Sequence, residues 1–580
     1  MLLLVLVATI VSPFVAAHEH TVERKDAWPA HVVALAESLP IQDGGRVKPF
    51  STFADFTLLR WSGKRSLRND GAQSTPATEF LLDLVFFPAQ AAQREVFLVQ
   101  NAEVIEAIGL SIDGKKKRDR YSFAELEPAL PRLMELAHQY DGVEPKSRTA
   151  VQAQLVHLGE NVLSFLRISR HETLAIVPPD VGHDEWHTPA ELAGATSLSE
   201  SEQRALRSFD ALVATNGDMA VFERDVSTFH AAVVDLATRR GEYAKIELER
   251  TYYKADLLTW SLALFVLGFV SMSVLWMRPQ NRLLYSSTWL LTLAGTLGLA
   301  AAITLRCWIR ARPPVSTLYE TVLFVTLAGC AIALVTEWID RKRIAISACA
   351  ILGMIGVFIA NGYETLDKQD TMPSLVAVLD TNFWLATHVT AITIGYSAGM
   401  LAALLGSLYL LTKLVGWKKR DPSFHRALGR MVYGVVCFGV IFATVGTILG
   451  GIWANDSWGR FWGWDPKENG ALLIVISQIV MLHARMGGYV RDHGLCMAAA
   501  FGGTIVAFSW WGVNLLGVGL HSYGFTSGIH TTLWTYYALQ WGVVVAGAVV
   551  WLRERKAMRR RTNAGDAASE SDSVRRSAAA

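Results

Sequence analysis

Nine long apolar runs follow residue 255, and they limit the folds open to this chain more than any other feature. They cover roughly 256–277, 283–305, 316–337, 344–361, 381–414, 430–452, 469–486, 494–515 and 531–552. Most are long enough for a helix that crosses the hydrocarbon layer of a membrane. Because 51% of the residues are hydrophobic and only 18% are charged, we predict an all-α polytopic membrane protein with about nine transmembrane helices, in a membrane domain over 256–552.

The chain before these runs has a different texture. Residues 18–255 are charged, helix-like and without a spanning run, which predicts a mostly helical extracytoplasmic domain. Residues 1–17 are apolar and end in Val-Ala-Ala, as expected for either a signal peptide or a short first transmembrane helix. Within the domain, the Gly- and Pro-marked stretch 41–54 predicts a turn that leads into a helix capped near Ser51.

The basic residues predict the orientation in the membrane. Counted through Arg561, the links after alternate runs, starting with the first, hold 18 Lys and Arg residues together with the adjoining run ends and the start of the tail, whereas the opposite links hold 6. Because basic residues favour the cytoplasmic side, residues 18–255 and the link after residue 452 are expected outside the cytoplasm. The tail, 553–580, is expected to be cytoplasmic, basic and disordered.

A tryptophan-rich stretch occupies residues 453–470. Four of the 19 tryptophans lie between residues 453 and 464, interleaved with Gly459 and Gly463. The stretch has no helical or strand periodicity, so we predict a loop at the membrane–water interface. It is either an aromatic belt that anchors helix ends or a platform for a flat apolar ligand, which the glycines allow to approach the backbone.

The central part of this stretch carries a family resemblance. Residues 458–468 read Trp-Gly-Arg-Phe-Trp-Gly-Trp-Asp-Pro-Lys-Glu. This sequence closely resembles the tryptophan-rich WWD signature of the haem-handling proteins of cytochrome c maturation, in the CcsA (ResC) branch. The resemblance covers residues 283–552, including Val-Ser-Thr-Leu-Tyr-Glu at 315–320, and stretch 41–54 also resembles a segment of long CcsA-type proteins.

The resemblance implies a haem site built from histidines and the loop. Histidines inside membrane helices are functional candidates, because burying them is costly, although a structural hydrogen bond is the alternative for His388. Neutral imidazoles can bind haem iron from its two sides, and by resemblance His388 and His521 take these places, with His530 as a competitor for the second. His483 corresponds to an inner-site iron ligand on the path of outgoing haem. The loop residues that the resemblance places at the haem are Trp458, Trp462, Trp464, Asp465, Gly459 and Gly463.

Several polar residues allow two interpretations. Arg306, Arg310 and Arg312 interrupt the charge bias, and they either bind carboxylates such as haem propionates or form interfacial pairs. Asp465 and Glu468 either orient a ligand histidine or the loop, or Asp465 caps a helix that starts near residue 467.

Two features carry little weight for metal or redox chemistry. The pair His183 and His187 is a weak metal candidate, because flanking Gly and Pro favour a loop. The five cysteines form no Cys-x-x-Cys pair, which disfavours a thiol–disulfide role.

These features lead to one principal functional hypothesis and two alternatives. The chain is expected to export haem b as a transported substrate and to support thioether attachment to apocytochrome c, as part of a holocytochrome c synthase with a CcsB (ResB) partner. A thiol-reducing partner is compatible with this role, and no nucleic-acid partner is expected. The alternatives are a CcmC- or CcmF-type haem chaperone without ligation activity and a membrane haem electron carrier. Residues 18–255 are interpreted as a docking platform.

Overall fold

The chain forms two units. The computed structural model describes residues 24, 26–68, 74–180, 184–195, 197–215, 218–375, 381–417, 421–518 and 529–578. Residues 1–255 and 368–374 make up the first unit, and residues 256–367 and 375–580 make up the second. Residues 1–17, the predicted signal peptide or first helix, lie outside the described residues, and so does His183 of the weak metal candidate His183–His187.

The first unit is mostly helical, as predicted, with three small antiparallel sheets of two strands each. Its principal helices are α2 (Ala30–Ser38), α3 (Phe50–Ser62), α4 (Ala77–Phe86), α5 (Pro88–Ala92), α6 (Glu103–Ala107), α7 (Phe123–Leu126), α8 (Leu130–Asp141), α9 (Ala150–Ser169), α10 (Pro189–Ala193), α11 (Glu200–Val213), α12 (Met219–Arg239) and α13 (Ile246–Ala255). The strands are β1 (Pro40–Asp43), β2 (Arg46–Pro49), β3 (Ser66–Arg68), β4 (Ser74–Pro76), β5 (Phe97–Val99) and β6 (Asp119–Tyr121).

The first hairpin corrects the predicted start of α3. Strands β1 and β2 pair from Pro40–Pro49 to Asp43–Arg46. The turn between them places Gly44 and Gly45 at φ +60° and +76°, a region that glycine adopts without strain. Helix α3 then begins directly after β2 with Pro49 at its N-cap and no side-chain cap. The predicted cap at Ser51 is therefore wrong, because the end of the hairpin sets the start of the helix.

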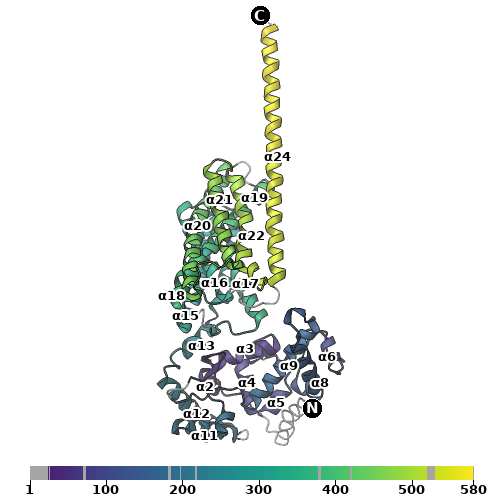
Figure 1. The fold of residues 1–580 in the computed structure, drawn as a ribbon, viewed down its shortest axis with the longest axis vertical. Coiled ribbons are helices and arrows are strands. Elements are labelled where there is room, and N and C mark those ends of the chain that lie inside the picture. The colour runs from purple at the N-terminus through teal and green to yellow at the C-terminus, as the bar shows by residue number, and fades with distance from the viewer. Residues whose placement is uncertain are drawn as a thin grey trace. The chain divides into compact units, whose positions relative to one another are not determined.

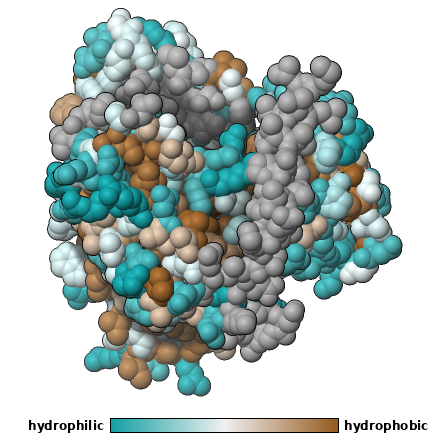
Figure 2. Space-filling model, turned by 90° about the horizontal axis from the view of Figure 1, so that it is seen from below, coloured by the Kyte–Doolittle hydropathy of each residue, from teal (hydrophilic) through white to brown (hydrophobic). Residues whose placement is uncertain are grey.

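Aromatic rings fill the core of the first unit. Trp61 lies at the centre, with ring centroids 5.7 Å from Phe165, 6.0 Å from Phe97 and 6.4 Å from Phe80. Tilted and edge-on rings at these separations pack favourably. Figure 2 shows hydrophilic residues interleaved with hydrophobic patches on the face seen from below.

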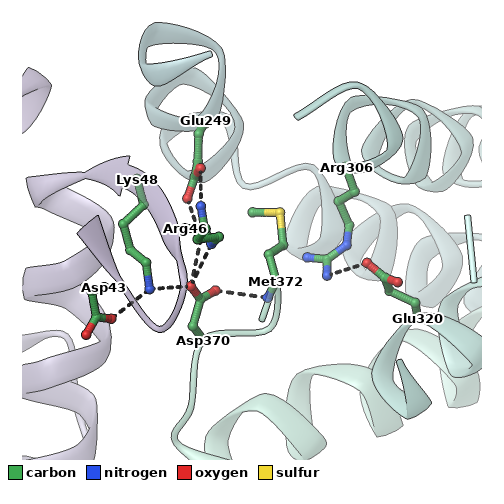
Figure 3. A network of polar contacts seen from close by, with 8 residues as sticks. All are labelled: Asp43, Arg46, Lys48, Glu249, Arg306, Glu320, Asp370 and Met372. Carbon is green, nitrogen blue, oxygen red and sulfur yellow. Dashed lines mark hydrogen bonds and ion pairs between the residues drawn. The ribbon is translucent and has the colours of Figure 1, made fainter. Parts of the chain in front are cut away.

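A buried ion network holds residues 368–374 in the first unit. Arg46 forms two hydrogen bonds to Glu249, at 2.7 and 2.8 Å, and a third to Asp370 at 2.7 Å. Lys48 donates to the same Asp370 oxygen at 2.8 Å, and the Met372 backbone N–H donates to the other at 2.9 Å. Figure 3 shows Asp370 facing both cations. Paired, hydrogen-bonded charges of this kind tolerate burial.

The second unit is a helical bundle. Its elements are α14 (Leu257–Met277), α15 (Arg282–Arg310), α16 (Leu318–Asp340), α17 (Ala345–Asp367), α18 (Asn382–Trp384), the π-helical turn η4 (Leu385–Val389), α19 (Thr390–Leu414), α20 (Pro422–Trp458), α21 (Pro466–Met486), α22 (Asp492–Ala507), the π-helical turn η5 (Phe508–Gly512), α23 (Val513–Leu515) and α24 (Ile529–Ala578). Among the described residues, nine helices are long and apolar enough to cross a membrane. This confirms the predicted all-α membrane architecture.

Helix α19 lies at the centre of this bundle. In the span Asn382–Leu414, which contains α19, 67% of the most apolar 18-residue stretch is buried. The corresponding share for the span His530–Arg560 of α24, at the periphery, is 22%. Small residues allow α20 to approach it closely: a Cβ atom at Gly446 would lie 2.6 Å from the backbone nitrogen of Ile392, and one at Gly395 would lie 2.9 Å from that of Ala443. Glycine contacts of this kind are typical of helices that pack tightly in membranes.

Helix α24 differs from the prediction at its C-terminal end. It is 50 residues long and continues to Ala578, whereas residues 553–580 were expected to be disordered. Figure 1 shows it extending past the other helices of the bundle. The tail follows an apolar helix without a break and is rich in Ala and Arg. Adding residues to an existing helix avoids the cost of nucleation, and these residues favour the helical state.

Candidate functional site

His388 lies in a π-helical turn at the start of the α19 span. Its Nδ1 atom is 2.7 Å from the carbonyl oxygen of Gly446 on α20. Because a carbonyl oxygen only accepts hydrogen bonds, Nδ1 carries the proton and Nε2 carries the lone pair. A neutral imidazole fixed in this way is the form that binds metals. Turns of π-helix often occur at functional sites.

The tryptophan-rich stretch is shorter as a loop than predicted. Helix α20 continues to Trp458, so Trp453 and Trp458 are helical and the loop begins at Gly459. There the chain turns through the left-handed conformation, and the Gly459 N–H donates to the Asn455 carbonyl oxygen at 2.9 Å. This is a common way for a helix to end. The predicted loop 453–470 is wrong at both ends, because α21 already starts at Pro466.

Asp465 and Glu468 fix the end of this loop to α21. The Asp465 carboxylate accepts from the Lys467 backbone N–H at 2.8 Å. The Glu468 carboxylate accepts from the backbone N–H groups of Asp465, at 3.1 Å, and Gly463, at 2.8 Å. These contacts form a capping box with one additional bond into the loop. The structure thus shows the capping role for Asp465 and a loop-orienting role for Glu468.

A cavity of about 350 Å³ connects these elements. Its walls come from the start of α16, from η4 and α19, from the last turns of α20, from the start of α21, and from η5 and α23. The volume is in the range of small-molecule sites, roughly 300–1,000 Å³. The lining side chains that matter most for the chemistry are His388, Trp453, Trp458, Trp462, Lys467 and Asn514.

The other predicted loop residues lie outside the lining of this cavity. Gly459, Gly463, Trp464 and Asp465 are not among the residues that line it. The Trp464 side chain is 71% exposed, and its ring stands edge-on to that of Trp462 at 6.3 Å. Trp464 also has a φ of +58°, which is strained for a residue with a side chain. Trp462 therefore lines the cavity, whereas the side chain of Trp464, two residues later in the same tight turn, is exposed.

Of the remaining candidate histidines, His483 and His530 are described, and neither lines the cavity. His521 lies in 519–528, outside the described residues. The exposed His483 on α21 does not line the cavity, and its Nδ1 lies 2.9 Å from the Ile479 carbonyl oxygen one turn earlier. His530 is exposed, and its Nε2 accepts from Trp534 Nε1 at 3.1 Å. Of these four predicted histidines, His388 alone is placed in the cavity by the described residues.

Arg306 is part of an internal ion pair. Its guanidinium donates to Glu320 at 3.0 Å, and its side chain is 3% exposed. The other Glu320 oxygen accepts from the Ser316 backbone N–H at 3.0 Å, and the guanidinium lies 5.0 Å from the Tyr319 ring centroid. Figure 3 shows this pair. The pairing interpretation therefore holds for Arg306, because Glu320 neutralises its charge.

No metal cluster or disulfide accompanies the cavity. Within the described ranges, no group of three or more His, Cys, Asp or Glu side chains is arranged to hold a metal ion. All five cysteines are free thiols.

The prediction missed one polar group in the cavity. Lys467 donates from Nζ to the Trp510 carbonyl oxygen at 2.8 Å, and Asn514 donates from Nδ2 to the same oxygen at 3.3 Å. The Trp510 ring is fixed by a 3.0 Å hydrogen bond from Nε1 to Thr321 Oγ1. In the sequence, only the position of Lys467 beside the tryptophans could have pointed to this group, because Asn514 and Thr321 lie far from it along the chain.

The fold and the site define a class: a multi-pass helical membrane protein with an aromatic, histidine-bearing cavity. Residues 315–521 match the family model described as Cytochrome C assembly protein. The Cytochrome c biogenesis protein CcsA of Guillardia theta is 34% identical over 236 residues, 36% of this chain and 76% of that protein. The chain belongs to this CcsA family.

Two other relatives extend the comparison. The Cytochrome c biogenesis protein CcsA of Chlamydomonas reinhardtii is 34% identical over 224 residues, which are 37% of this chain and 61% of that protein. Protein NrfI of Wolinella succinogenes is 25% identical over 499 residues, which are 83% of this chain and 53% of that protein. The chain thus spans less than two thirds of each of these two proteins, and the NrfI match extends well beyond the CcsA-like membrane helices.

Proposed function

We propose that this protein holds haem b, as a transported substrate, in the cavity beside His388 and supports its attachment to apocytochrome c. The observation that carries the proposal is the His388 imidazole, fixed by the Gly446 carbonyl oxygen and facing a cavity lined by tryptophans. Neutral imidazole is a common haem-iron ligand, and aromatic side chains suit a flat, apolar macrocycle. His521 is the proposed ligand on the other side of the iron.

The attachment step requires positioning more than acid–base catalysis. A cysteine thiol of the apocytochrome CxxCH motif adds across a haem vinyl group: a sulfur–carbon bond forms, the vinyl double bond is lost, and the thiol proton moves to the neighbouring carbon. No net oxidation or reduction occurs. Holding the haem in one orientation while the thiols approach is the contribution we assign to this chain.

The proposal includes a path, an orientation and partners. The bias of basic residues supports an outer location for the cavity, with haem entering from the cytoplasmic side past His483. His483 lies exposed on α21, where a second membrane subunit of the CcsB (ResB) type would supply the other inner ligand. The first unit is proposed as the docking platform for that subunit or for the apocytochrome. A thiol-reducing partner would keep the CxxCH cysteines reduced.

Visible spectroscopy of the purified full-length protein tests the ligand assignment. We expect wild type to show a reduced low-spin haem spectrum that is lost in His388→Ala and His521→Ala and restored by added imidazole. His530→Ala is the matched control, since this histidine lies outside the cavity lining, and it should keep the spectrum. His483→Ala should change haem content only when a CcsB-type subunit is co-expressed. Unchanged spectra in all the His388 and His521 variants would contradict the proposal.

A further inference from the structure

The cavity has one cationic side chain that forms no ion pair among the described residues. Among the described residues that line it, the two with ordinary formal charges are Lys467 and Glu468. Glu468 accepts hydrogen bonds from the backbone N–H groups of Gly463 and Asp465. The Asp465 carboxylate attracts the Lys467 ammonium electrostatically, and it accepts a hydrogen bond from the Lys467 backbone N–H.

The contacts of Lys467 contrast with those of other lysines. In the part of the chain that the structure describes, Lys467 forms no ion pair, and its ammonium donates to a neutral acceptor, the Trp510 carbonyl oxygen. Lys48 and Lys413, by comparison, pair with Asp370 and Glu554 at 2.8 and 2.9 Å. An ammonium group has three N–H donors. A buried cation that forms no close ion pair is costly, so an anionic group bound in the cavity beside it would stabilise it.

A second side chain at the same place also lacks a partner. Asn514 is 5% exposed and lines the cavity. Its Nδ2 donates to the Trp510 carbonyl oxygen, but its Oδ1 accepts no hydrogen bond. Leaving a buried polar atom without a partner is unfavourable. Lys467 and Asn514 therefore present, around one carbonyl oxygen, a charged donor and an unused acceptor.

We infer that Lys467 and Asn514 form a subsite for a carboxyl group of the molecule that occupies the cavity. The ammonium would pair with the carboxylate, and the Asn514 amide oxygen would accept a hydrogen bond from a water molecule that also donates to the carboxylate. This inference rests on the proposed function for the identity of the occupant: the group is then a haem propionate. Lys467 thus replaces Arg306 as the candidate that binds a carboxylate, because Arg306 already pairs with Glu320.

Such a subsite would determine the orientation of the haem. Histidines that bind the iron from its two sides leave the macrocycle free to rotate about the line through them. Pairing one propionate with Lys467, on a different helix from His388, removes this freedom. Because the vinyl groups have fixed positions relative to the propionates, the subsite would determine which vinyl group each approaching thiol meets.

Esterified haem tests the subsite without altering the protein. Equilibrium titrations, followed by haem absorbance, would compare the full-length wild type with iron protoporphyrin IX and with its dimethyl ester, which lacks the acid groups. We expect the free acid to bind about tenfold more tightly, equivalent to about 1.4 kcal/mol. In Lys467→Gln the two should bind equally, and Lys467→Arg should restore the preference for the acid.

Lys413→Gln is the matched control, because it removes a lysine charge from the same unit but not from the cavity lining. It should keep the wild-type preference. Equal binding of acid and ester by wild type, or a preference that survives in Lys467→Gln, would overturn the subsite while leaving the proposed function intact. Failure of wild type to bind either porphyrin would overturn both.

Discussion

At the residue scale, His388 depends on the absence of side chains on the facing helix. Gly446 supplies the carbonyl oxygen that fixes Nδ1, and Gly450, one turn later on α20, leaves space for the ring. A Cβ atom at Gly450 would lie 2.5 Å from His388 Cε1 and 2.9 Å from Nδ1. Such contacts are too short to exist, so the imidazole and a side chain at position 450 exclude each other.

Gly450→Ala should therefore displace the imidazole and weaken haem binding about tenfold or more, while overpacking costs the fold only about 1–3 kcal/mol. Haem titration and thermal unfolding of the same sample would separate the two effects. Gly434→Ala is the matched control on α20, because a Cβ atom there meets no atom within 4 Å. Wild-type haem affinity in Gly450→Ala would show that His388 does not depend on this space.

At the element scale, the start of α21 holds the loop that ends the tryptophan-rich stretch. The capping box satisfies backbone N–H groups that a helix start leaves without partners. Because Glu468 also accepts from the Gly463 N–H, the helix start and the loop are one structural element. The orientation of Trp462 toward the cavity depends on it.

Glu468→Ala should free the Gly463 amide and raise hydrogen exchange across 459–468, with a cost to the helix start of about 1 kcal/mol. Glu468→Gln retains an acceptor oxygen and should be closer to wild type. Exchange followed by mass spectrometry of peptides from this region measures both. Asp218→Ala removes the corresponding cap of α12 in the first unit and should leave 459–468 unchanged. Equal exchange in wild type and Glu468→Ala would contradict this account of the loop.

At the scale of the whole molecule, the chain crosses between the two units three times. The chain passes from the first unit to the second after Ala255, returns at Lys368 and leaves again after Ser374. Residues 368–374 connect α17 with the elements that carry His388, yet they belong to the first unit. Arg46, Lys48 and Asp370 hold them there. Burial would raise the pKa of Asp370, but the charges of Arg46 and Lys48 outweigh it and hold this pKa well below its usual value.

Asp370→Asn should leave two buried cations underpaired and destabilise the docking of 368–374 by about 3 kcal/mol, measured as faster hydrogen exchange at Met372. Because the folded pKa of Asp370 is lowered, its stabilisation is complete above the unfolded pKa, about 4, and decreases as the pH falls below it. The difference between variant and wild type should therefore stay constant from pH 8 to about 5 and shrink in stronger acid.

A matched control for this prediction is Glu135→Gln, which removes a carboxylate from the exposed pair Arg132–Glu135 in the same unit. Exposed pairs contribute little to stability, so exchange of 368–374 should not change. A difference between Asp370→Asn and wild type that grows as the pH falls below 4 would contradict the lowered pKa of Asp370.

The sequence by itself determined the membrane class and the family. Lipid offers no hydrogen-bond partners to the backbone, so nine long apolar runs have to be helices, and the structure confirms them. The family followed from a short contiguous segment that needs no tertiary information. His388 was identifiable on the same local basis, as a polar residue inside an apolar run.

Tertiary structure decided which groups are partners. Arg306 pairs with Glu320, Lys467 and Asn514 meet at Trp510, and Asp370 binds Arg46 across 324 residues. Helix α20 continues into the predicted loop. Local sequence gives the charge and the helical tendency of each residue, but neutralisation, burial and helix ends depend on side chains that only folding brings within a few ångströms.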